Sequence, residues 1–203
     1  MRFLYLMRDV FINVRYLAFY IVLILFPNRL VISDLRAWNK AFYGSKGEKH
    51  SLAFFLYKLP EFRNLFYHRY KERKIIVGLL KIFAPPMNTF YIGNSAKLGE
   101  GIIFYHPFCT YLNCISIGDN CRIRNGTTFG NKSDDNNLRP MIGNNVNVGV
   151  NVTIIGDIKI GDNAIIGAGA IVTKSFPGDS IIAGNPAKII KLKKSMKSCQ
   201  KSI

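Results

Sequence analysis

The sequence predicts a mainly β protein, in which a parallel β-helix built on a six-residue repeat follows an α-helical region. Aliphatic residues recur every six positions over the second half of the 203-residue chain. Gly, Asn and Asp gather at the turn positions between them, whereas residues 1–83 show apolar residues at helical spacing. A six-residue period with an aliphatic anchor that is commonly followed by Gly is typical of a hexapeptide β-helix.

The repeat is most regular from residue 142 onward. Each hexad supplies one short strand and a turn, three hexads make a triangular coil, and only stacking of coils buries the inward side chains. The aliphatic anchors are Ile142, Val148, Ile154, Ile160, Ile166 and Val172, and the second inward positions are Val146, Val152, Ile158, Ala164 and Ala170. Earlier anchors fall at 117, 123 and 129, and at 92, 98 and 104.

The register of the repeat breaks twice, between anchors 104 and 117 and between anchors 129 and 142. The second break contains the polar stretch NKSDDNNLRPM, which should project as a loop. The first break contains His106. Because functional residues concentrate where a rigid scaffold is interrupted, we expect both breaks to lie near a functional site.

The N-terminal part reads as several helices. Ser33 or Asp34 is the expected N-cap of one helix, Pro60 interrupts a later one, and Ala84-Pro85-Pro86 stops helix formation. The predicted organisation has three parts: a helical region that could contact a membrane (1–91), the β-helix (92–187) and a basic C-terminal tail (188–203).

The formal net charge of +16 is carried by the two ends of the chain. Residues 92–187 are neutral overall, whereas the helical region and the tail are strongly basic. Such charge suits an anionic membrane or phosphorylated ligands. We expect no nucleic-acid partner, since no zinc-finger spacing or RNP-like motif is present.

The uncharged stretch at 16–26, YLAFYIVLILF, is shorter than the roughly 20 residues that a membrane-spanning helix needs. It fits either a core helix or an interfacial helix that lies on the inner leaflet. The four cysteines form no CxxC pair, which favours free thiols in a reducing compartment. One histidine in the repeat region is too few for a three-histidine zinc site, so we expect no metal.

The repeat closes with IGAGAIVTKSFPGDSIIAGNPAKIIK, residues 166–191, which resembles the C-terminal segment of hexapeptide acyltransferases. That family has a left-handed parallel β-helix and uses acetyl-CoA. Within it, GEGIIFYHP and NGTTFGN are most similar to serine acetyltransferases and to related O-acetyltransferases of surface-polysaccharide loci. The segment EFRNLFYHRY at 61–70 is similar to serine acetyltransferase-like proteins of bacterial glycan clusters.

The resemblance implies a homotrimer with acetyl-CoA in a groove between neighbouring subunits. The positions that match cofactor contacts of the family are Ala168, Thr173, Lys174, Lys188 and Lys191. Coenzyme A carries a diphosphate and a 3′-phosphate, so lysines at the rim of the groove have a direct electrostatic role. Small residues at 167–169 let a ligand approach the backbone closely.

His106 matches the catalytic histidine of the family. Imidazole suits the removal of a hydroxyl proton during attack on a thioester, and we expect direct transfer without an acyl-enzyme. The chain departs from serine acetyltransferases where it has Tyr91 and Tyr105 in place of aspartates, and Arg139 in place of a second histidine. A carboxylate partner for His106 would then come from Asp134, Asp135 or a neighbouring subunit.

These residues favour an acetyl-CoA-dependent O-acetyltransferase acting on a sugar or polysaccharide precursor, in the cytoplasm or at the inner membrane face. Tyr105 and Arg139 beside the base would suit stacking on a sugar and hydrogen bonding to it. One alternative is a serine O-acetyltransferase of cysteine biosynthesis. Another is a non-catalytic β-helix scaffold, which would bind no coenzyme A.

Overall fold

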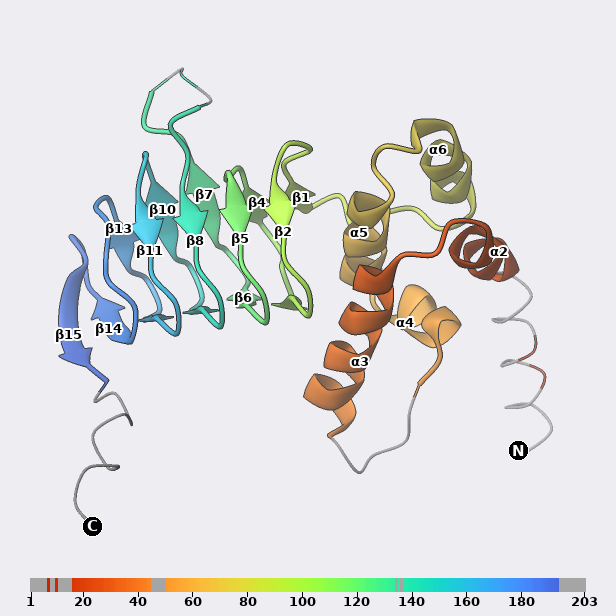
Figure 1. Cartoon of the computed structure of the whole chain (residues 1–203), viewed down its shortest axis with the longest axis horizontal. Coiled ribbons are helices and arrows are strands. Elements are labelled where there is room, and N and C mark those ends of the chain that lie inside the picture. The colour runs from red at the N-terminus through yellow and green to blue at the C-terminus, as the bar shows by residue number, and fades with distance from the viewer. Residues whose placement is uncertain are drawn as a thin grey trace, which may run out of the picture.

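The computed structural model describes Met7, Val10 and residues 16–44, 50–133, 135 and 137–193. Figure 1 shows a group of helices at one end and a stack of short strands at the other. Within the described residues, no helix has both the length and the apolar character needed to cross a membrane. The helices are α2 (Leu17–Leu25), α3 (Arg29–Tyr43), α4 (Leu52–Lys58), α5 (Pro60–Arg69) and α6 (Lys74–Phe83).

The strands form three sheets, which are the three faces of a parallel β-helix of about five turns, so the predicted fold class is confirmed. Only the pairing of β14 with β15 is antiparallel among the strand pairs of the described chain. Sheet A contains β1 (Phe90–Ile92), β4 (Thr110–Leu112), β7 (Thr128–Gly130), β10 (Thr153–Ile155) and β13 (Ile171–Val172). Sheet B contains β2 (Lys97–Leu98), β5 (Ser116–Ile117), β8 (Met141–Ile142) and β11 (Lys159–Ile160). Sheet C contains β3 (Ile103–Tyr105), β6 (Arg122–Arg124), β9 (Asn147–Val148), β12 (Ile165–Ile166), β14 (Ser180–Ala183) and β15 (Lys188–Leu192).

The interior of the β-helix is a stack of the predicted anchors. In sheet A, Ile154 lies above Phe129 and below Val172, and all three are fully buried. Leu112, which lay outside the predicted period, fills the same column between Ile92 and Phe129. It follows the anchor Phe104 by eight residues, so the extra residues of the first register break lie in the turn that contains His106.

The second register break is a projecting loop, as the sequence predicts. Strand β7 ends at Gly130 and β8 begins at Met141, and the segment between them extends away from the coils (Figure 1). The turns of the coil often use the left-handed region, both at asparagines such as Asn145 and Asn163 and at glycines. At Gly126, φ is +68° and an added Cβ would lie 2.0 Å from Oδ1 of Asn151, so a side chain there would be strained and would displace Asn151.

The start of α3 differs from the sequence prediction. Oδ1 of Asn28 accepts a hydrogen bond from the backbone N–H of Leu30 at 3.0 Å and thereby caps the helix. Ser33 and Asp34 lie inside α3, so the prediction that one of them is the N-cap was wrong. The predicted interruption at Pro60 is confirmed, because this residue begins α5.

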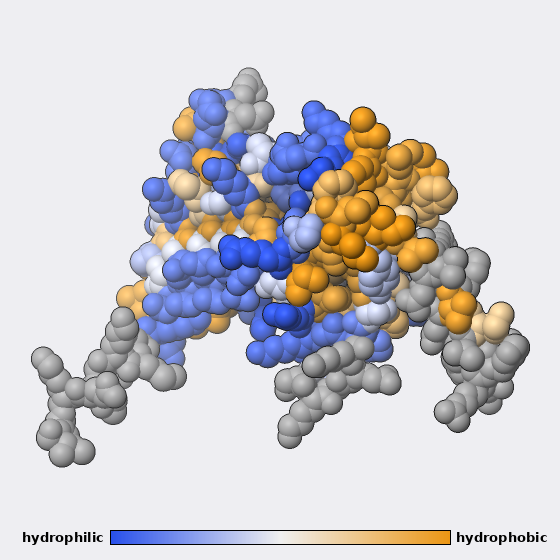
Figure 2. Space-filling model, turned by 45° about the vertical axis from the view of Figure 1, so that its right-hand side comes forward, coloured by the Kyte–Doolittle hydropathy of each residue, from blue (hydrophilic) through white to orange (hydrophobic). Residues whose placement is uncertain are grey.

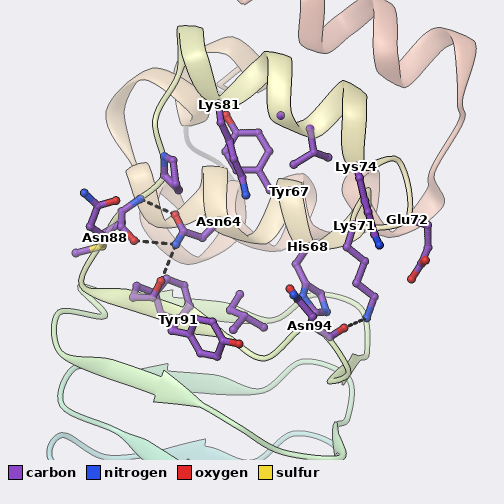
Figure 3. Close-up of a pocket in the computed structure, with 16 residues that line it drawn as sticks. Asn64, Tyr67, His68, Lys71, Glu72, Lys74, Lys81, Asn88, Tyr91 and Asn94 are labelled. Atoms are coloured by element: carbon purple, nitrogen blue, oxygen red, sulfur yellow. Dashed lines mark hydrogen bonds between the residues drawn. The ribbon is translucent and has the colours of Figure 1, made fainter.

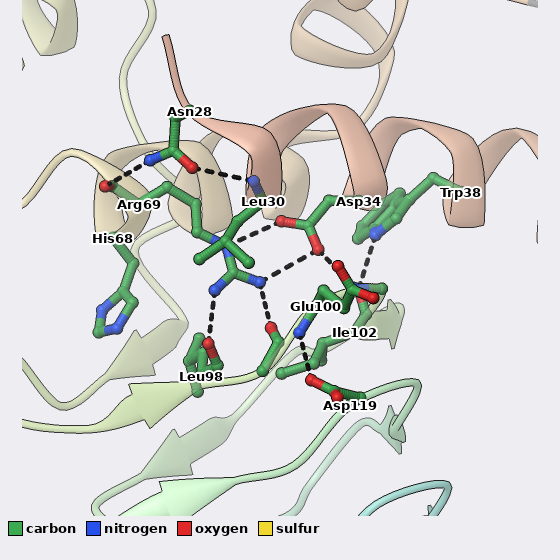
Figure 4. A network of polar contacts seen from close by, with 12 residues as sticks. Asn28, Leu30, Asp34, Trp38, His68, Arg69, Leu98, Glu100, Ile102 and Asp119 are labelled. Carbon is green, nitrogen blue, oxygen red and sulfur yellow. Dashed lines mark hydrogen bonds and ion pairs between the residues drawn. The ribbon is translucent and has the colours of Figure 1, made fainter. Parts of the chain in front are cut away.

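A buried ion pair joins the helices to the first turn of the β-helix (Figure 4). Nε of Arg69 on α5 lies 2.8 Å from Oδ2 of Asp34 on α3, and both side chains are almost fully buried. The guanidinium also donates to the backbone carbonyls of Leu98, at 2.7 Å, and Gly99, at 2.5 Å. The N–H of Gly101 donates to the Asp34 carboxylate at 2.9 Å. The pair therefore bonds two helices and one turn of the coil at once.

Two further contacts fix the helices on this end of the β-helix. Nε1 of Trp38 donates to the carbonyl of Ile102 at 2.8 Å. The Asn64 amide donates to the carbonyls of Met87 and Phe90 and accepts from the N–H of Met87 at 2.7 Å. The helices thus cover the first coil, whose strands β1, β2 and β3 have no preceding coil to pair with.

Replacing Arg69 by Met should lower the free energy of unfolding by about 3–5 kcal/mol, because it leaves the Asp34 carboxylate buried without its cation. The double variant Asp34→Leu/Arg69→Met should be less destabilised than Arg69→Met alone, since no unpaired charge stays buried. Urea unfolding measures both values. Arg36→Met, at an exposed position of α3, is the matched control and should leave stability nearly unchanged. An Arg69→Met protein as stable as the wild type would show that the pair does not hold the two parts together.

Candidate functional site

His106 lies in the turn between β3 and β4, at the corner between sheets C and A. Its backbone adopts φ of +48°, which is uncommon for a residue with a side chain. The carbonyl of His106 accepts a hydrogen bond from the N–H of Phe108 at 2.6 Å. The imidazole is exposed on the outside of the coil, where it can meet a ligand.

The corner that carries His106 continues along the whole β-helix. Ala168 lies at the same corner, three turns further on, so the spacing between strands separates the two positions by about 14 Å. A chain of backbone hydrogen bonds runs along this edge. It consists of Gly126 N–H to Phe108 O, Asn151 N–H to Asn125 O and Gly169 N–H to Val150 O, each 2.9 Å long.

The five candidate cofactor residues are all exposed, but they do not lie together in one protomer. Lys188 begins β15 opposite Ala183 and lies near the corner of Ala168, because Ala187 bonds the carbonyl of Ile171. Lys191 lies further along the same pair of strands. Thr173 and Lys174 follow β13, at the opposite end of sheet A. The residues thus divide between two corners of the coil.

An exposed aromatic surface, made of Tyr91, Phe108 and Tyr111, lies on sheet A beside the His106 turn. The rings of Tyr91 and Tyr111 are stacked, with centroids 4.5 Å apart and planes inclined by 13°. Each ring covers one face of the other, so the pair exposes ring edges, hydroxyl groups and one outer face on each ring. Tyr91 therefore replaces an expected carboxylate by part of a stacking surface.

Within one protomer, neither Tyr105 nor Arg139 is arranged beside the imidazole as expected for a sugar contact. The ring of Tyr105 contacts Phe42 on α3 and the guanidinium of Arg124, at 5.5 Å each. The guanidinium of Arg139 donates to Oγ of Ser95 at 2.7 Å, at the far end of sheet A.

The carboxylate that the structure places near His106 is Glu61, in the first turn of α5. This side chain is buried, and burial raises its pKa. The hydrogen bond to its own backbone N–H and the nearby charges of His106 and Arg63 act in the opposite direction. Sequence reasoning missed Glu61 because the residue lies 45 positions before the histidine, although EFRNLFYHRY already stood out as a motif. Of the two expected carboxylates, Asp134 lies outside the described residues and Asp135 lies in the projecting loop.

The thiols differ in exposure. Cys109 is exposed, whereas Cys114 and Cys121 are buried inside the coil. Burial raises the pKa of each buried thiol to about 12, which disfavours the reactive thiolate. Among the described residues, no group of three or more His, Cys, Asp or Glu side chains is placed to hold a metal ion.

A cavity of about 600 Å³, which no sequence motif predicted, lies between α5, α6 and the first coil (Figure 3). Tyr91 lines it, so the cavity borders the aromatic surface. His68 lies in its wall and donates from Nε2 to the carbonyl of Ala96 at 3.0 Å. Burial, and secondarily the charge of Lys71, lowers the pKa of His68 to about 4. The other charged side chains that line the cavity are Lys71, Glu72, Lys74 and Lys81.

The buried His68 should make the free energy of unfolding depend on pH. Its pKa is near 6.5 when unfolded and about 4 when folded, so the unfolded chain binds the proton first. Stability is therefore full above pH 6.5 and falls as the pH drops towards 4, by up to about 3 kcal/mol. His68→Gln keeps a donor for the Ala96 carbonyl but does not titrate. Urea unfolding of both proteins from pH 7 to pH 4 should show their difference in stability changing by this amount, and parallel curves would contradict it.

The β-helix of hexapeptide repeats places the chain in the class of hexapeptide-repeat transferases. Family models agree: residues 139–174 match "Bacterial transferase hexapeptide (six repeats)", and residues 110–129 match "Hexapeptide repeat of succinyl-transferase". The chain is 36% identical over 115 residues to the putative colanic acid biosynthesis acetyltransferase WcaB of Escherichia coli, covering 56% of this chain and 71% of that protein.

Serine acetyltransferases are also similar. The enzyme of Synechococcus elongatus is 34% identical over 139 residues, which cover 64% of this chain and 57% of that protein. This chain thus matches little more than half of that relative. Serine acetyltransferase of Brucella abortus, solved in complex with coenzyme A, superposes with a TM-score of 0.66 at 25% identity, over 87% of this chain and 73% of that one. The chain belongs to the serine acetyltransferase-like group of hexapeptide-repeat acetyltransferases.

Proposed function

We propose that the protein is an acetyl-CoA-dependent O-acetyltransferase that acetylates a hydroxyl group of a sugar or polysaccharide precursor. The observation that carries this proposal is the exposed His106 beside the aromatic surface. Because the acetyl donor is a cytoplasmic metabolite, the proposal places the reaction in the cytoplasm, at or near the inner face of the membrane.

In the proposed reaction, His106 acts as a general base. Its imidazole takes the proton of the acceptor hydroxyl while the oxygen attacks the thioester carbonyl, which forms a tetrahedral intermediate. Collapse of this intermediate breaks the carbon–sulfur bond and releases the thiolate of coenzyme A. The imidazolium returns the proton to that sulfur, so the histidine is regenerated without an acyl-enzyme. The buried state of Cys114 and Cys121 excludes these two thiols as covalent nucleophiles.

The edge that joins His106 to Ala168 is the proposed path of the donor. The solved Brucella abortus neighbour was crystallised with coenzyme A, which supports this choice of ligand. Exposed ammonium groups of Lys174 and Lys188 would meet its phosphates. Because these two lysines lie at different corners of one coil, a single protomer cannot offer both to one ligand. This division supports a homotrimer with the donor held between subunits.

The proposed acceptor is a sugar because of what surrounds His106. A free amino acid needs a carboxylate for its ammonium group, yet both positions where serine acetyltransferases carry aspartate hold tyrosine here. The outer ring face of Tyr91 or Tyr111 suits the apolar side of a sugar ring, and their hydroxyl groups can hydrogen-bond to it. The similarity to a putative colanic acid biosynthesis acetyltransferase of Escherichia coli also supports an acceptor other than free serine. Serine remains the second candidate, supported by the Synechococcus enzyme and the solved neighbours.

Glu61 is the proposed positioning residue for His106. The carboxylate is buried in the first turn of α5, where burial raises its pKa and the nearby charge of His106 lowers it, so a negative charge on Glu61 would act on that imidazole. Such a charge stabilises the imidazolium that forms when the base takes its proton. The aspartates of serine acetyltransferases that Tyr91 and Tyr105 replace belong to the coil. Glu61, in contrast, belongs to the helical region.

His106→Asn should lower kcat about 10²- to 10⁴-fold, because the variant keeps the shape of the turn but lacks the base. Coenzyme A affinity, measured by calorimetry, should stay within about twofold, since the cation contacts are unchanged. Thiol release during acetyl transfer gives kcat. Unchanged turnover would exclude His106 as the base, and loss of coenzyme A binding would point to a folding defect instead.

The same assay includes Glu61→Gln, which removes the charge and keeps the side-chain volume. It should lower kcat about tenfold with an unchanged KM for acetyl-CoA. The control Glu72→Gln, at an exposed position after α5, should behave as the wild type.

Acceptor screening tests the proposed substrate class. With acetyl-CoA as donor, sugars and oligosaccharides from surface polysaccharides should support thiol release, and serine should not exceed the rate of acceptor-free hydrolysis. Tyr91→Ala should raise KM for the sugar acceptor about tenfold, because it removes half of the stacked face. Turnover of serine at a metabolic rate would replace this proposal by the serine alternative.

A further inference from the structure

Helices α2 and α6 each present a second apolar face to solvent. On α2 this face consists of Leu17, Ile21, Ile24 and Leu25. On α6 it consists of Ile75, Leu79, Ile82 and Phe83. Both sets follow the spacing i, i+4, i+7 and i+8, which places four residues on one side of a helix. Their side chains are between 46 and 81% exposed.

These faces are not needed for the protein core. Phe19 and Val22 of α2, and Val77 and Leu80 of α6, already pack inward and are buried. A surface helix of a water-exposed protein normally turns polar residues outward once its inner stripe is satisfied. A contiguous apolar area of this kind marks a surface that contacts something other than water.

The two faces lie at the same end of the molecule. Figure 1 shows α2 and α6 together at the end remote from the later coils, and Figure 2 shows the largest hydrophobic area over this helical end. The guanidinium of Arg73, at the start of α6, lies 3.5 Å from the ring centroid of Phe26, at the end of α2. Leu25 and Arg73 also line one cavity of about 360 Å³.

Cations border the apolar area. Arg29, Arg73, Lys74 and Lys81 are exposed around the two helices, against one exposed acid, Glu72. On α6, the two lysines lie to one side of the outward stripe, along the cavity of Figure 3. An apolar stripe bordered by lysine and arginine matches the boundary between headgroups and acyl chains of an anionic bilayer.

We propose that α2 and α6 form a membrane-docking face that lies in the headgroup region of a bilayer containing anionic lipid. The eight apolar side chains enter the acyl boundary, and the four cations meet lipid phosphates. An anionic bilayer fits this face better than a second copy of the chain does. Two identical faces would bring eight cations together, and these would repel one another. The proposal concerns binding alone and does not depend on the acetyl acceptor.

Vesicle co-sedimentation of the purified full chain tests the docking face. The protein should sediment with vesicles of equal parts phosphatidylglycerol and phosphatidylcholine and much less with phosphatidylcholine alone. The double variant Ile24→Glu/Ile82→Glu should lose at least tenfold in affinity. Ile190→Glu is the matched control: its position on β15 is 67% exposed, compared with 73% for Ile82, and it should bind as the wild type.

A second variant separates lipid from other occupants. Lys74→Glu/Lys81→Glu keeps the apolar faces and should weaken binding to anionic vesicles by at least tenfold. Thermal unfolding by circular dichroism checks that each variant is folded. Wild-type protein that stays in the supernatant would overturn the proposal, as would a folded Ile24→Glu/Ile82→Glu variant that sediments normally. Self-association in ultracentrifugation that this apolar variant abolishes, without any vesicle binding, would assign the face to a second copy.

Discussion

The ion pair between Asp34 and Arg69 is the contact on which the arrangement of helices and coil depends. Its guanidinium bonds one helix and two carbonyls of the first coil, so α3 and α5 have a defined orientation over that coil. Glu61 lies in the first turn of the helix that Arg69 ends, and the charge of His106 acts on its buried carboxylate. The candidate site is thus assembled from two parts of the chain, and neither the coil nor the helices would form it alone.

The coil could be predicted from the sequence because its packing depends on a short pattern that repeats along the chain. Each inward position must carry an apolar side chain that stacks on the one below, so Ile154 and Val172 recur at a fixed interval. The prediction of inward residues failed where the six-residue period changed. Leu112 follows Phe104 by eight residues and precedes Ile117 by five, so it matched no hexad even though it fills the same column. The longer interval is the His106 turn, where the backbone departs from the repeat to turn a side chain outward.

The helical contacts could not be predicted because they depend on residues far apart in the chain. Asp34 fits the local rule for an N-cap, but Asn28 satisfies that rule earlier, and the carboxylate pairs with a residue 35 positions away. Helix α6 poses a different difficulty. Its sequence KIIVGLLKIF has apolar residues on two sides, and a single sequence does not show which side packs on the protein. The structure separates buried Val77 from exposed Ile82, and the proposed docking face rests on this difference.

The cavity between α5, α6 and the first coil borders both the proposed docking face and the aromatic surface. Lys74 and Lys81 border the face on one side and line the cavity on the other, and Tyr91 belongs both to the cavity wall and to the aromatic surface. A polar group attached to a membrane lipid would therefore meet lysines first and stacked tyrosines next, on the coil that carries His106. Free serine needs no such route, since it diffuses to the site from water. If both proposals hold, the geometry favours a glycan carried on a lipid phosphate over a small soluble acceptor.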